Sequence, residues 1–401
     1  MHISKSEKLC LAVGVIIAAV GVCFFLHLRS DLPAGGNISQ EVLSIESDWP
    51  VYRGNPQLTG FADGSLGERL EVLWKFKTGG AVTSSAVVYD GTVFIGSADH
   101  SLYAIDVLGG TEKWSYETGD VIEGSACVGS DTVYAASTDG FVYALDSRTG
   151  LEKWKFETGG KIMGSVNRAY APDGVGLRLF VGSWDNSIYC IDAESGKAVW
   201  EYETDYYVNG APAIDDGLLV AGGCDAVIHV VNTADGSAVK KIDAGAYIAG
   251  SAVFEGGEVY LGNYENVFMK ADVTVGEIVW NFTESDDAIV SSAAISEEYV
   301  VFGGQDNLVY CLNRSDGSVV WKFRTLGKVD SSPVICDGKV VVGSGDGRLY
   351  LLRLSDGGKL WSYEIGEAII SSPAIVDGVV IIGSNDGYVY AFRSLGQAVV
   401  E

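Results

Sequence analysis

The chain has 401 residues, and its 53 Asp and Glu against 27 Lys and Arg give a formal net charge of −26. Such an acidic protein repels phosphate backbones, so the composition argues against nucleic acid as a partner. Four histidines, and seven cysteines without a Cys-x-x-Cys or adjacent pair, predict neither a histidine-rich metal centre nor a disulfide framework.

The first predicted element is an apolar run over residues 9–28, in which only His27 is polar. As a helix rising about 1.5 Å per residue, this run matches a hydrocarbon core roughly 30 Å thick. We predict a retained transmembrane anchor. A cleaved signal peptide is the alternative, although the run is longer than is usual for one and no small-x-small site follows it. Lys5 and Lys8 favour a cytoplasmic location for residues 1–8 and an extracytoplasmic body, attached to the membrane by a single pass.

The body is predicted to begin after a polar linker. Residues 29–47 have the Pro and Gly content of a flexible tether. Residues 48–70 are predicted to form an extended N-terminal segment, residues 71–396 the folded repeats, and residues 397–401 a short tail. We expect the body to be a monomer.

From residue 74 onward, a tryptophan returns about every forty residues. The spacings are 40, 40, 46, 80, 41 and 40, and Lys240 occupies the empty slot in the doubled step. The chain therefore contains eight copies of one unit, which predicts a radial or stacked array. The tryptophans, to which we assign a structural docking role, are Trp74, Trp114, Trp154, Trp200, Trp280, Trp321 and Trp361.

One unit predicts four short strands, at 82–89, 92–97, 101–107 and 111–117, which form an antiparallel meander. An aspartate recurs in the turn between the second and third strands, as in Asp99, and we predict that it binds backbone amides there. The last unit ends after its third strand, whereas residues 71–77 form a fourth strand with no partners before it. Residues 71–77 should therefore complete the last unit and close an all-β, eight-bladed propeller of four-stranded antiparallel blades.

The repeated pattern of alanine-x-aspartate, Thr-Gly or Ser-Gly, and tryptophan, as in residues 143–154 and 189–200, resembles the tryptophan-docking repeat of the PQQ-like β-propeller family. The resemblance covers 71–396, and residues 49–60 are similar to the segment that commonly precedes such propellers. The family contains non-catalytic, BamB-like scaffolds as well as quinone-dependent dehydrogenases. The chain lacks the adjacent cysteines and long insertions of many of those enzymes. No residue can therefore be assigned a catalytic role, and neither PQQ nor a metal is expected as a cofactor.

Loops that differ between the units are where function is expected on a repeat fold. The loops that follow the second and fourth strands should share one face. On this face, aromatic residues of units three to five replace the small residues of other units. Exposed Trp and Tyr are enriched in recognition surfaces, although they can also cover hydrophobic surface under the loops. The candidate partner-binding residues are Trp184, Tyr206, Tyr207, Asn209, Tyr247 and Tyr264.

Units four and five also depart from the repeat, with Lys240 for tryptophan, His229 and Met269 for tyrosine, and Glu265 for aspartate. Neutral sequence drift in a stable ring explains these changes. The alternative is that these units dock a partner or the N-terminal segment. Three acidic residues, Glu284, Asp286 and Asp287, lack the spacing of a calcium loop.

The sequence therefore predicts a membrane-anchored, extracytoplasmic scaffold, similar to BamB-like proteins, that binds a protein or a surface polymer. A PQQ-dependent oxidoreductase and the sensor half of a signalling system are the alternatives.

Overall fold

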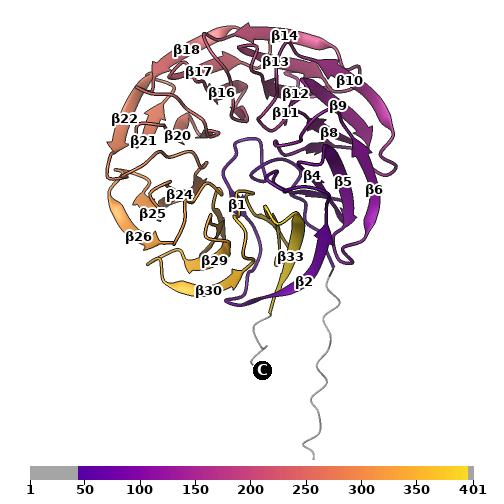
Figure 1. Cartoon of the computed structure of the whole chain (residues 1–401). Coiled ribbons are helices and arrows are strands. Elements are labelled where there is room, and N and C mark those ends of the chain that lie inside the picture. The colour runs from indigo at the N-terminus through magenta and orange to yellow at the C-terminus, as the bar shows by residue number, and fades with distance from the viewer. Residues whose placement is uncertain (1–43, 396–401) are drawn as a thin grey trace, which may run out of the picture. The chain divides into compact units, whose positions relative to one another are not determined.

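The computed structural model describes residues 44–395. The predicted anchor at 9–28, most of the linker and the tail lie outside the described residues. Within residues 44–395 there is no helix that could cross a membrane. The body that begins at Ile45 consists of eight sheets, each with four antiparallel strands, arranged around a central axis (Figure 1).

Each sheet is one blade, numbered here from the N-terminus. Blade 1 comprises β3 (Val87–Tyr89), β4 (Thr92–Gly96), β5 (Ser101–Asp106) and β6 (Glu112–Glu117), and blade 2 comprises β7 (Cys127–Gly129), β8 (Thr132–Ala136), β9 (Phe141–Asp146) and β10 (Glu152–Glu157). Blade 3 comprises β11 (Asn167–Tyr170), β12 (Leu177–Gly182), β13 (Ser187–Asp192) and β14 (Ala198–Glu203), and blade 4 comprises β15 (Ala213–Asp215), β16 (Leu218–Gly222), β17 (Val227–Asn232) and β18 (Ala238–Asp243).

The second half repeats this order. Blade 5 comprises β19 (Val253–Glu255), β20 (Glu258–Gly262), β21 (Phe268–Asp272) and β22 (Glu277–Phe282), and blade 6 comprises β23 (Ala294–Ile295), β24 (Tyr299–Gly303), β25 (Leu308–Asn313) and β26 (Val319–Arg324). Blade 7 comprises β27 (Val334–Cys336), β28 (Lys339–Gly343), β29 (Arg348–Arg353) and β30 (Lys359–Glu364), with β1 (Phe61–Ala62) added parallel to β27.

Blade 8 contains the predicted ring closure. It comprises β31 (Ala374–Val376), β32 (Val379–Gly383), β33 (Tyr388–Ser394) and β2 (Leu70–Lys77). The N-terminal strand β2 pairs with the C-terminal strand β33, with Lys77 opposite Tyr388 and Leu70 opposite Ser394. The eight-bladed, four-stranded architecture is therefore confirmed, and the pairing leaves no blade short of a strand.

The innermost strands are shorter than predicted. The expected strand at 82–89 is β3, which covers only Val87–Tyr89. The residues before it lie where all eight blades converge, and their amides bind neighbouring blades instead of extending the ladder: the Val82 amide donates to Ser384 of blade 8. The strand pattern in the sequence could not distinguish a ladder within one blade from contacts between blades.

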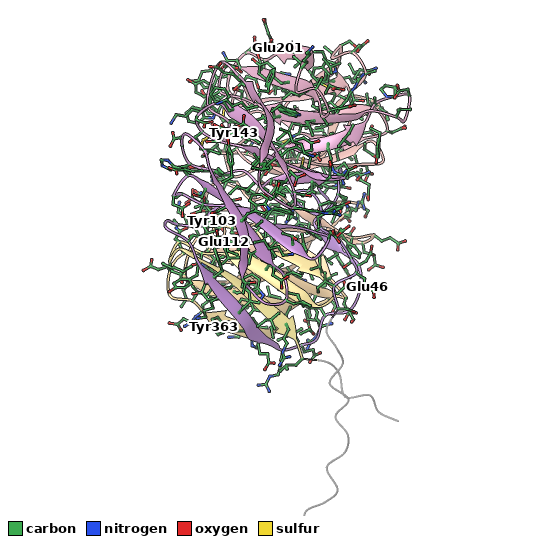
Figure 2. All side chains as sticks on the ribbon, turned by 90° about the vertical axis from the view of Figure 1, so that its right-hand side faces the viewer. Glu46, Tyr103, Glu112, Tyr143, Glu201 and Tyr363 are labelled. Atoms are coloured by element: carbon green, nitrogen blue, oxygen red, sulfur yellow. The ribbon has the colours of Figure 1, made fainter. Side chains whose placement is uncertain are left out.

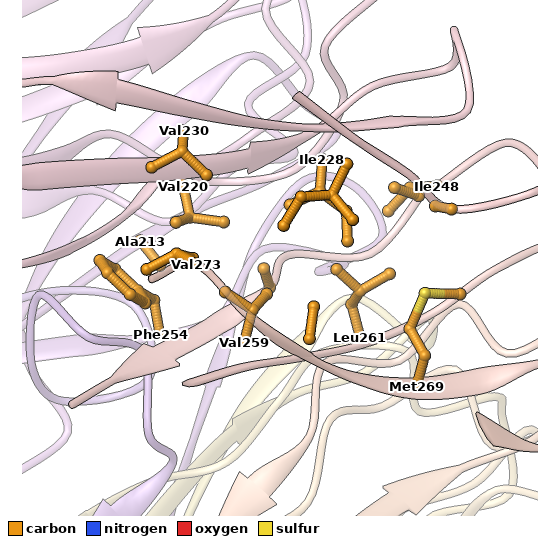
Figure 3. Close-up of a cluster of buried hydrophobic side chains, with 14 of the residues drawn as sticks. Ala213, Val220, Ile228, Val230, Ile248, Phe254, Val259, Leu261, Met269 and Val273 are labelled. Carbon is orange, nitrogen blue, oxygen red and sulfur yellow. The ribbon is translucent and has the colours of Figure 1, made fainter. Parts of the chain in front are cut away.

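The core consists of apolar layers between successive blades, because each sheet has two faces to bury. Between blades 4 and 5, Val220, Val230, Phe254 and Leu261 belong to one buried cluster (Figure 3). Successive residues of a middle strand point to opposite faces of its blade, into the two neighbouring layers. All residues of β4 in blade 1 are therefore buried.

The recurring tryptophans lie between blades on the outer strands. Trp74 Nε1 donates to the carbonyl of Val107 in the next blade at 2.8 Å, and Trp74 packs so closely on Gly110 that a Cβ there would lie 2.5 Å from the indole. The corresponding bonds of Trp114, Trp154, Trp200 and Trp321 reach Ser147, Ala193, Thr233 and Leu354, at 3.0, 3.1, 3.0 and 2.6 Å. Trp280 packs on Gly317 with no bond from its Nε1 to a described residue, and the Trp361 ring meets Phe392 edge-on at 5.7 Å.

Residues 46–62 form a strap across one face of the ring. The inner edges of the innermost strands have free amides, and strap carbonyls accept from them. Val88 donates to Trp49, Val128 to Pro50, Ile214 to Pro56, Phe254 to Gln57, Ile295 to Thr59 and Ile335 to Gly60, at 2.8–3.0 Å. The Asn167 side chain of blade 3 also donates to Pro56, and the Glu46 and Ser47 amides donate to Asp377 of blade 8. The strap therefore bonds to all eight blades. Figure 1 shows this indigo segment crossing the middle of the ring.

Candidate functional site

The ring has two different faces. The strap lies on the face formed by the turns that follow the first and third strands of each blade, as its contact with Asp377 shows. The loops that follow the second and fourth strands form the opposite face, which we call the aromatic face. Figure 2 views the ring from the side, and in it Glu46 lies toward one face and Tyr143 toward the other. The chain therefore enters the ring on the face opposite the predicted site.

Four of the six predicted site residues lie together on the aromatic face. Trp184 and Tyr207 stack with ring centroids 5.0 Å apart and an interplanar angle of 11°, and Tyr206 lies 4.4 Å from Tyr207. Trp184 Nε1 donates to Asn209 Oδ1 at 2.6 Å, and Asn209 Nδ2 lies 3.1 Å from Cys224 Sγ. These contacts join the turn of blade 3 to the loop and turn of blade 4.

The other two predicted residues extend this surface to blade 5. The Tyr264 amide donates to the Tyr247 carbonyl at 3.0 Å. Their rings point to solvent, with exposed fractions of 59% for Tyr247 and 51% for Tyr264, and Tyr206 is 47% exposed. Half-exposed aromatic rings on adjacent loops give a rigid surface with polar edges, which suits recognition.

The turn aspartates support the loops of this face. Asp99 Oδ1 accepts from the Ser101 amide at 3.1 Å, and Asp99 Oδ2 accepts from the Gly79 amide and from the Tyr103 hydroxyl at 2.5 and 2.7 Å. Burial, together with this bond to Asp99, raises the pKa of Tyr103 to about 12. The aspartate therefore binds amides as the repeat predicts, and it also holds a tyrosine that sequence analysis did not connect to it.

An axial cavity of about 250 Å³ opens on the aromatic face, and Tyr52 of the strap lines it. A belt of serines surrounds it, in which the backbone amide of one blade donates to the seryl hydroxyl of the next, as from Ser125 to Ser165 at 2.8 Å. Tyr52 bonds to Ser332 of this belt at 3.0 Å. The small residues of the repeat thus hold neighbouring blades together.

A pyrroloquinoline quinone has three carboxylates, and the described lining of the cavity offers no cationic side chain to pair with them. This described lining contains the carboxylates Glu123 and Asp330 and no lysine or arginine. Like charges in a half-enclosed site repel, so the cavity would disfavour such an anion that binds without a cation. Nor do the acids of blade 6 converge: Glu284 pairs with Lys322 at 2.8 Å, and Asp287 with Lys328 at 3.5 Å. Among the described residues, no group of three or more His, Cys, Asp or Glu is placed to hold a metal ion.

Sequence reasoning missed Cys224 and Tyr52. Cys224 contacts Asn209 within the site, and burial raises the pKa of its thiol. Tyr52 forms its hydrogen bond with Ser332, 280 residues away. The sequence contains no signal for either contact, because Asn209 meets Cys224 through the packing of a loop on a turn of blade 4, and Tyr52 meets Ser332 only across the closed ring.

The sequence matches the family described as outer membrane protein assembly factor BamB over residues 65–167, 167–269 and 272–401. No curated protein matches it. The structure is similar to BamB from Moraxella catarrhalis, with a TM-score of 0.68 and 20% identity over 81% of this chain and 100% of that chain.

Two enzymes share the same fold. A europium-containing methanol dehydrogenase has a TM-score of 0.74 and 14% identity, over 86% of this chain and 98% of that chain. The quinohemoprotein alcohol dehydrogenase from Comamonas testosteroni has a TM-score of 0.74 and 14% identity, over 92% and 83%. At these identities the likeness concerns the fold, which hosts both enzymes and non-enzymes.

Proposed function

Because the chain belongs to the family of the outer membrane protein assembly factor BamB, we propose that it is a non-catalytic binding propeller whose aromatic face holds a protein partner. The observation that carries the proposal is the stack of Trp184 on Tyr207, with the ring of Tyr206 against Tyr207 and Trp184 held by Asn209. A preformed aromatic surface loses little side-chain entropy when it binds, so more of its contact energy goes into affinity. A surface polymer is the alternative ligand.

Residues 9–28 would anchor the propeller to the outer side of a membrane. The strap begins on the face opposite the aromatic residues, and Glu46 and Ser47 are bonded there to Asp377. An anchored propeller would therefore be tethered through the strap face and leave the aromatic face free for a partner. Protease treatment of intact cells, followed by alkaline extraction of the membranes, tests this arrangement. A protease-sensitive propeller that stays with the membranes is the expected result.

Crosslinking in intact cells tests the binding function. The variant that combines Tyr206→Ala with Tyr207→Ala should lose the crosslinked species that the native protein captures. Tyr170→Ala is the matched control, because Tyr170 is 66% exposed on the opposite face. Undiminished capture by the double variant would reject the aromatic face as the binding site.

The dehydrogenase fold makes quinone binding the competing function. Addition of PQQ with Ca²⁺ should leave the quinone absorbance unchanged and give no dye reduction with alcohols, because no lysine or arginine lines the axial cavity to pair with the quinone carboxylates. A shifted quinone spectrum, abolished by Tyr52→Ala at the cavity lining, would support the enzyme instead.

A further inference from the structure

Three blades place a lysine of their own over a tyrosine of the neighbouring strand. Lys75 Nζ lies 4.8 Å from the centroid of Tyr390, Lys322 Nζ lies 5.3 Å from that of Tyr310, and Lys155 Nζ lies 5.9 Å from that of Tyr143. Each of these lysines directly follows a docking tryptophan.

The tyrosine beneath each lysine is itself bonded to the turn aspartate of its blade. The three bonds are those of Tyr143 to Asp139, Tyr310 to Asp306 and Tyr390 to Asp386. An ammonium over an aromatic ring is a stabilising arrangement, and the turn aspartate fixes the ring beneath it. This position in the blade is therefore a cation site that the protein itself fills three times.

Blade 3 has the tyrosine and the aspartate of this site but lacks the lysine. The Tyr189 hydroxyl donates to Asp185 Oδ2 at 2.8 Å, as in the other blades. Glu201 stands where the lysine would be, directly after Trp200, and its carboxylate accepts from the Ser187 hydroxyl at 2.7 Å. Figure 2 shows Glu201 at the outer rim of the ring.

An open cavity of about 270 Å³ results, which we call the blade-3 acidic cavity. Its lining includes Asp185, Tyr189, Glu201 and Glu203. None of these three carboxylates forms an ion pair with another residue in the described part of the chain. The cavity thus has the tyrosine and turn aspartate that lie beneath a lysine elsewhere in the ring, with two glutamates, Glu201 and Glu203, in place of the cation.

The blade-3 acidic cavity and the aromatic stack are carried by the same turn and the same loop. Asp185 follows Trp184 in the same turn, and Glu203 and Thr204 lead into the loop that carries Tyr206. A chain lying on the stacked rings can therefore extend one side chain into the cavity. We propose that the cavity receives a lysine or arginine side chain of the protein segment that binds the aromatic face. This inference rests on the proposed function and names the chemistry of its partner.

Charge supports this choice of occupant over a neutral polymer. The protein has a net charge of −26, so its field attracts a basic segment over a distance of about one Debye length, roughly 8–10 Å at physiological salt. In the cavity a basic side chain can contact the carboxylates and lie over the ring of Tyr189. A neutral polysaccharide would stack on the rings and leave the three carboxylates without a partner.

Two synthetic peptides that differ in one residue provide the test: acetyl-Gly-Gly-Tyr-Lys-Tyr-Gly-Gly-amide and its Lys→Gln counterpart. Titrated against the full chain, the lysine peptide should bind about tenfold more tightly, and this preference should weaken in 0.5 M salt. Glu201→Lys should abolish the preference, because the new side chain would fill the cavity as Lys155 does in blade 2. Glu277→Lys is the matched control, since it makes the same charge change at an exposed position near the opposite end of an outer strand.

Equal affinity for the two peptides, absence of binding by both at millimolar concentration, or equal effects of Glu201→Lys and Glu277→Lys would each overturn the inference. So would salt-independent binding of a neutral oligosaccharide that excludes the lysine peptide. Crosslinking in cells separates this failure from failure of the proposed function. If the Tyr206→Ala, Tyr207→Ala variant loses capture while Glu201→Lys keeps it, the binding face stands and only the basic contact is rejected.

Discussion

Lys240 Nζ donates to the carbonyl oxygen of Thr274 at 2.7 Å, across the boundary between blades 4 and 5. This is the bond that a tryptophan Nε1 makes at the equivalent boundaries, and the aliphatic stem of Lys240 covers Gly276 as an indole covers glycine elsewhere. The apparent gap in the tryptophan repeat is therefore a substitution that preserves the hydrogen bond between the blades.

Lys240→Trp is expected to stabilise the ring. The lysine already supplies the hydrogen bond, so the gain comes from the extra apolar area that an indole would bury on Gly276, about 1 kcal/mol in the free energy of unfolding. Lys240→Ala should lower the free energy of unfolding by a similar amount, because the hydrogen bond to Thr274 is lost. Urea unfolding of the three proteins measures both changes. A destabilised Lys240→Trp variant would show that the space over Gly276 is too narrow for an indole.

His229 makes the stability of blade 4 depend on pH. It is fully buried, with Nε2 at 2.8 Å from Asp225 and Nδ1 at 3.1 Å from the Tyr202 hydroxyl. Burial lowers its pKa, and nearby Lys241 adds to this effect, whereas Asp225 and Asp205 oppose it. The folded protein therefore protonates His229 only at a lower pH than the unfolded chain, which binds a proton below about pH 6.5.

The stability that this histidine contributes is complete above about pH 6.5 and should be lost as the pH falls below it, with a slope of at most about 1.4 kcal/mol per pH unit. His229→Tyr restores the tyrosine–aspartate pair of the other blades and should remove that part of the pH dependence. Thermal unfolding between pH 5 and 8 gives the comparison. Parallel curves for the two proteins would contradict the assignment.

The strap depends on close packing between Arg53 and Gly60. Arg53 is 1% exposed and donates from Nη2 to the Ala293 carbonyl at 2.5 Å, while its Nε and Nη1 have no partner among the described residues. Burial lowers the pKa of its guanidinium to about 10. Gly60 has a φ of 63°, and a Cβ there would lie 1.8 Å from Arg53 Nη2.

Gly60→Ala should therefore cost about 3 kcal/mol, from left-handed strain and from displacement of the guanidinium. Arg53→Met alone should be nearly neutral, since it removes a buried charge together with its single bond. In the double variant the flexible methionine can move away from the new Cβ. The loss in the free energy of unfolding caused by Gly60→Ala should therefore be smaller by about 1 kcal/mol or more. Additive costs in a double-mutant cycle would show that the two residues do not meet.

Asn209 fixes the aromatic stack through its side chain. Asn209→Leu removes the acceptor of Trp184 Nε1, which should cost about 1–2 kcal/mol and free the indole from Tyr207. The Trp184 contribution to fluorescence, obtained by difference with Trp184→Phe, should shift to longer wavelength in this variant. Cys224→Ser is the control, because a hydroxyl can still accept from the Asn209 amide. An unchanged spectrum in Asn209→Leu would show that stacking alone holds Trp184.

The sequence alone predicted the ring, because the information is local and repeated. Each unit contains its own strand alternation and turn residues, and the incomplete last unit with the orphan strand at 71–77 left closure as the one consistent pairing. The family resemblance is likewise confirmed by the match over residues 65–269 and 272–401. The anchor at 9–28 stays a prediction, and so does the role of the aromatic residues.

Only the tertiary structure decided how the parts of this ring are joined. The strap bonds to Val88 through Trp49 and to Ile335 through Gly60, although the second pair is 275 residues apart in the chain. Likewise, Lys240 replaces tryptophan only because Thr274 and Gly276 of the next blade meet it. The alternation of apolar residues determines which face of a strand is buried, but not which distant backbone atoms its edge will bind. Ring curvature sets those partners, and it exists only after all eight blades have closed.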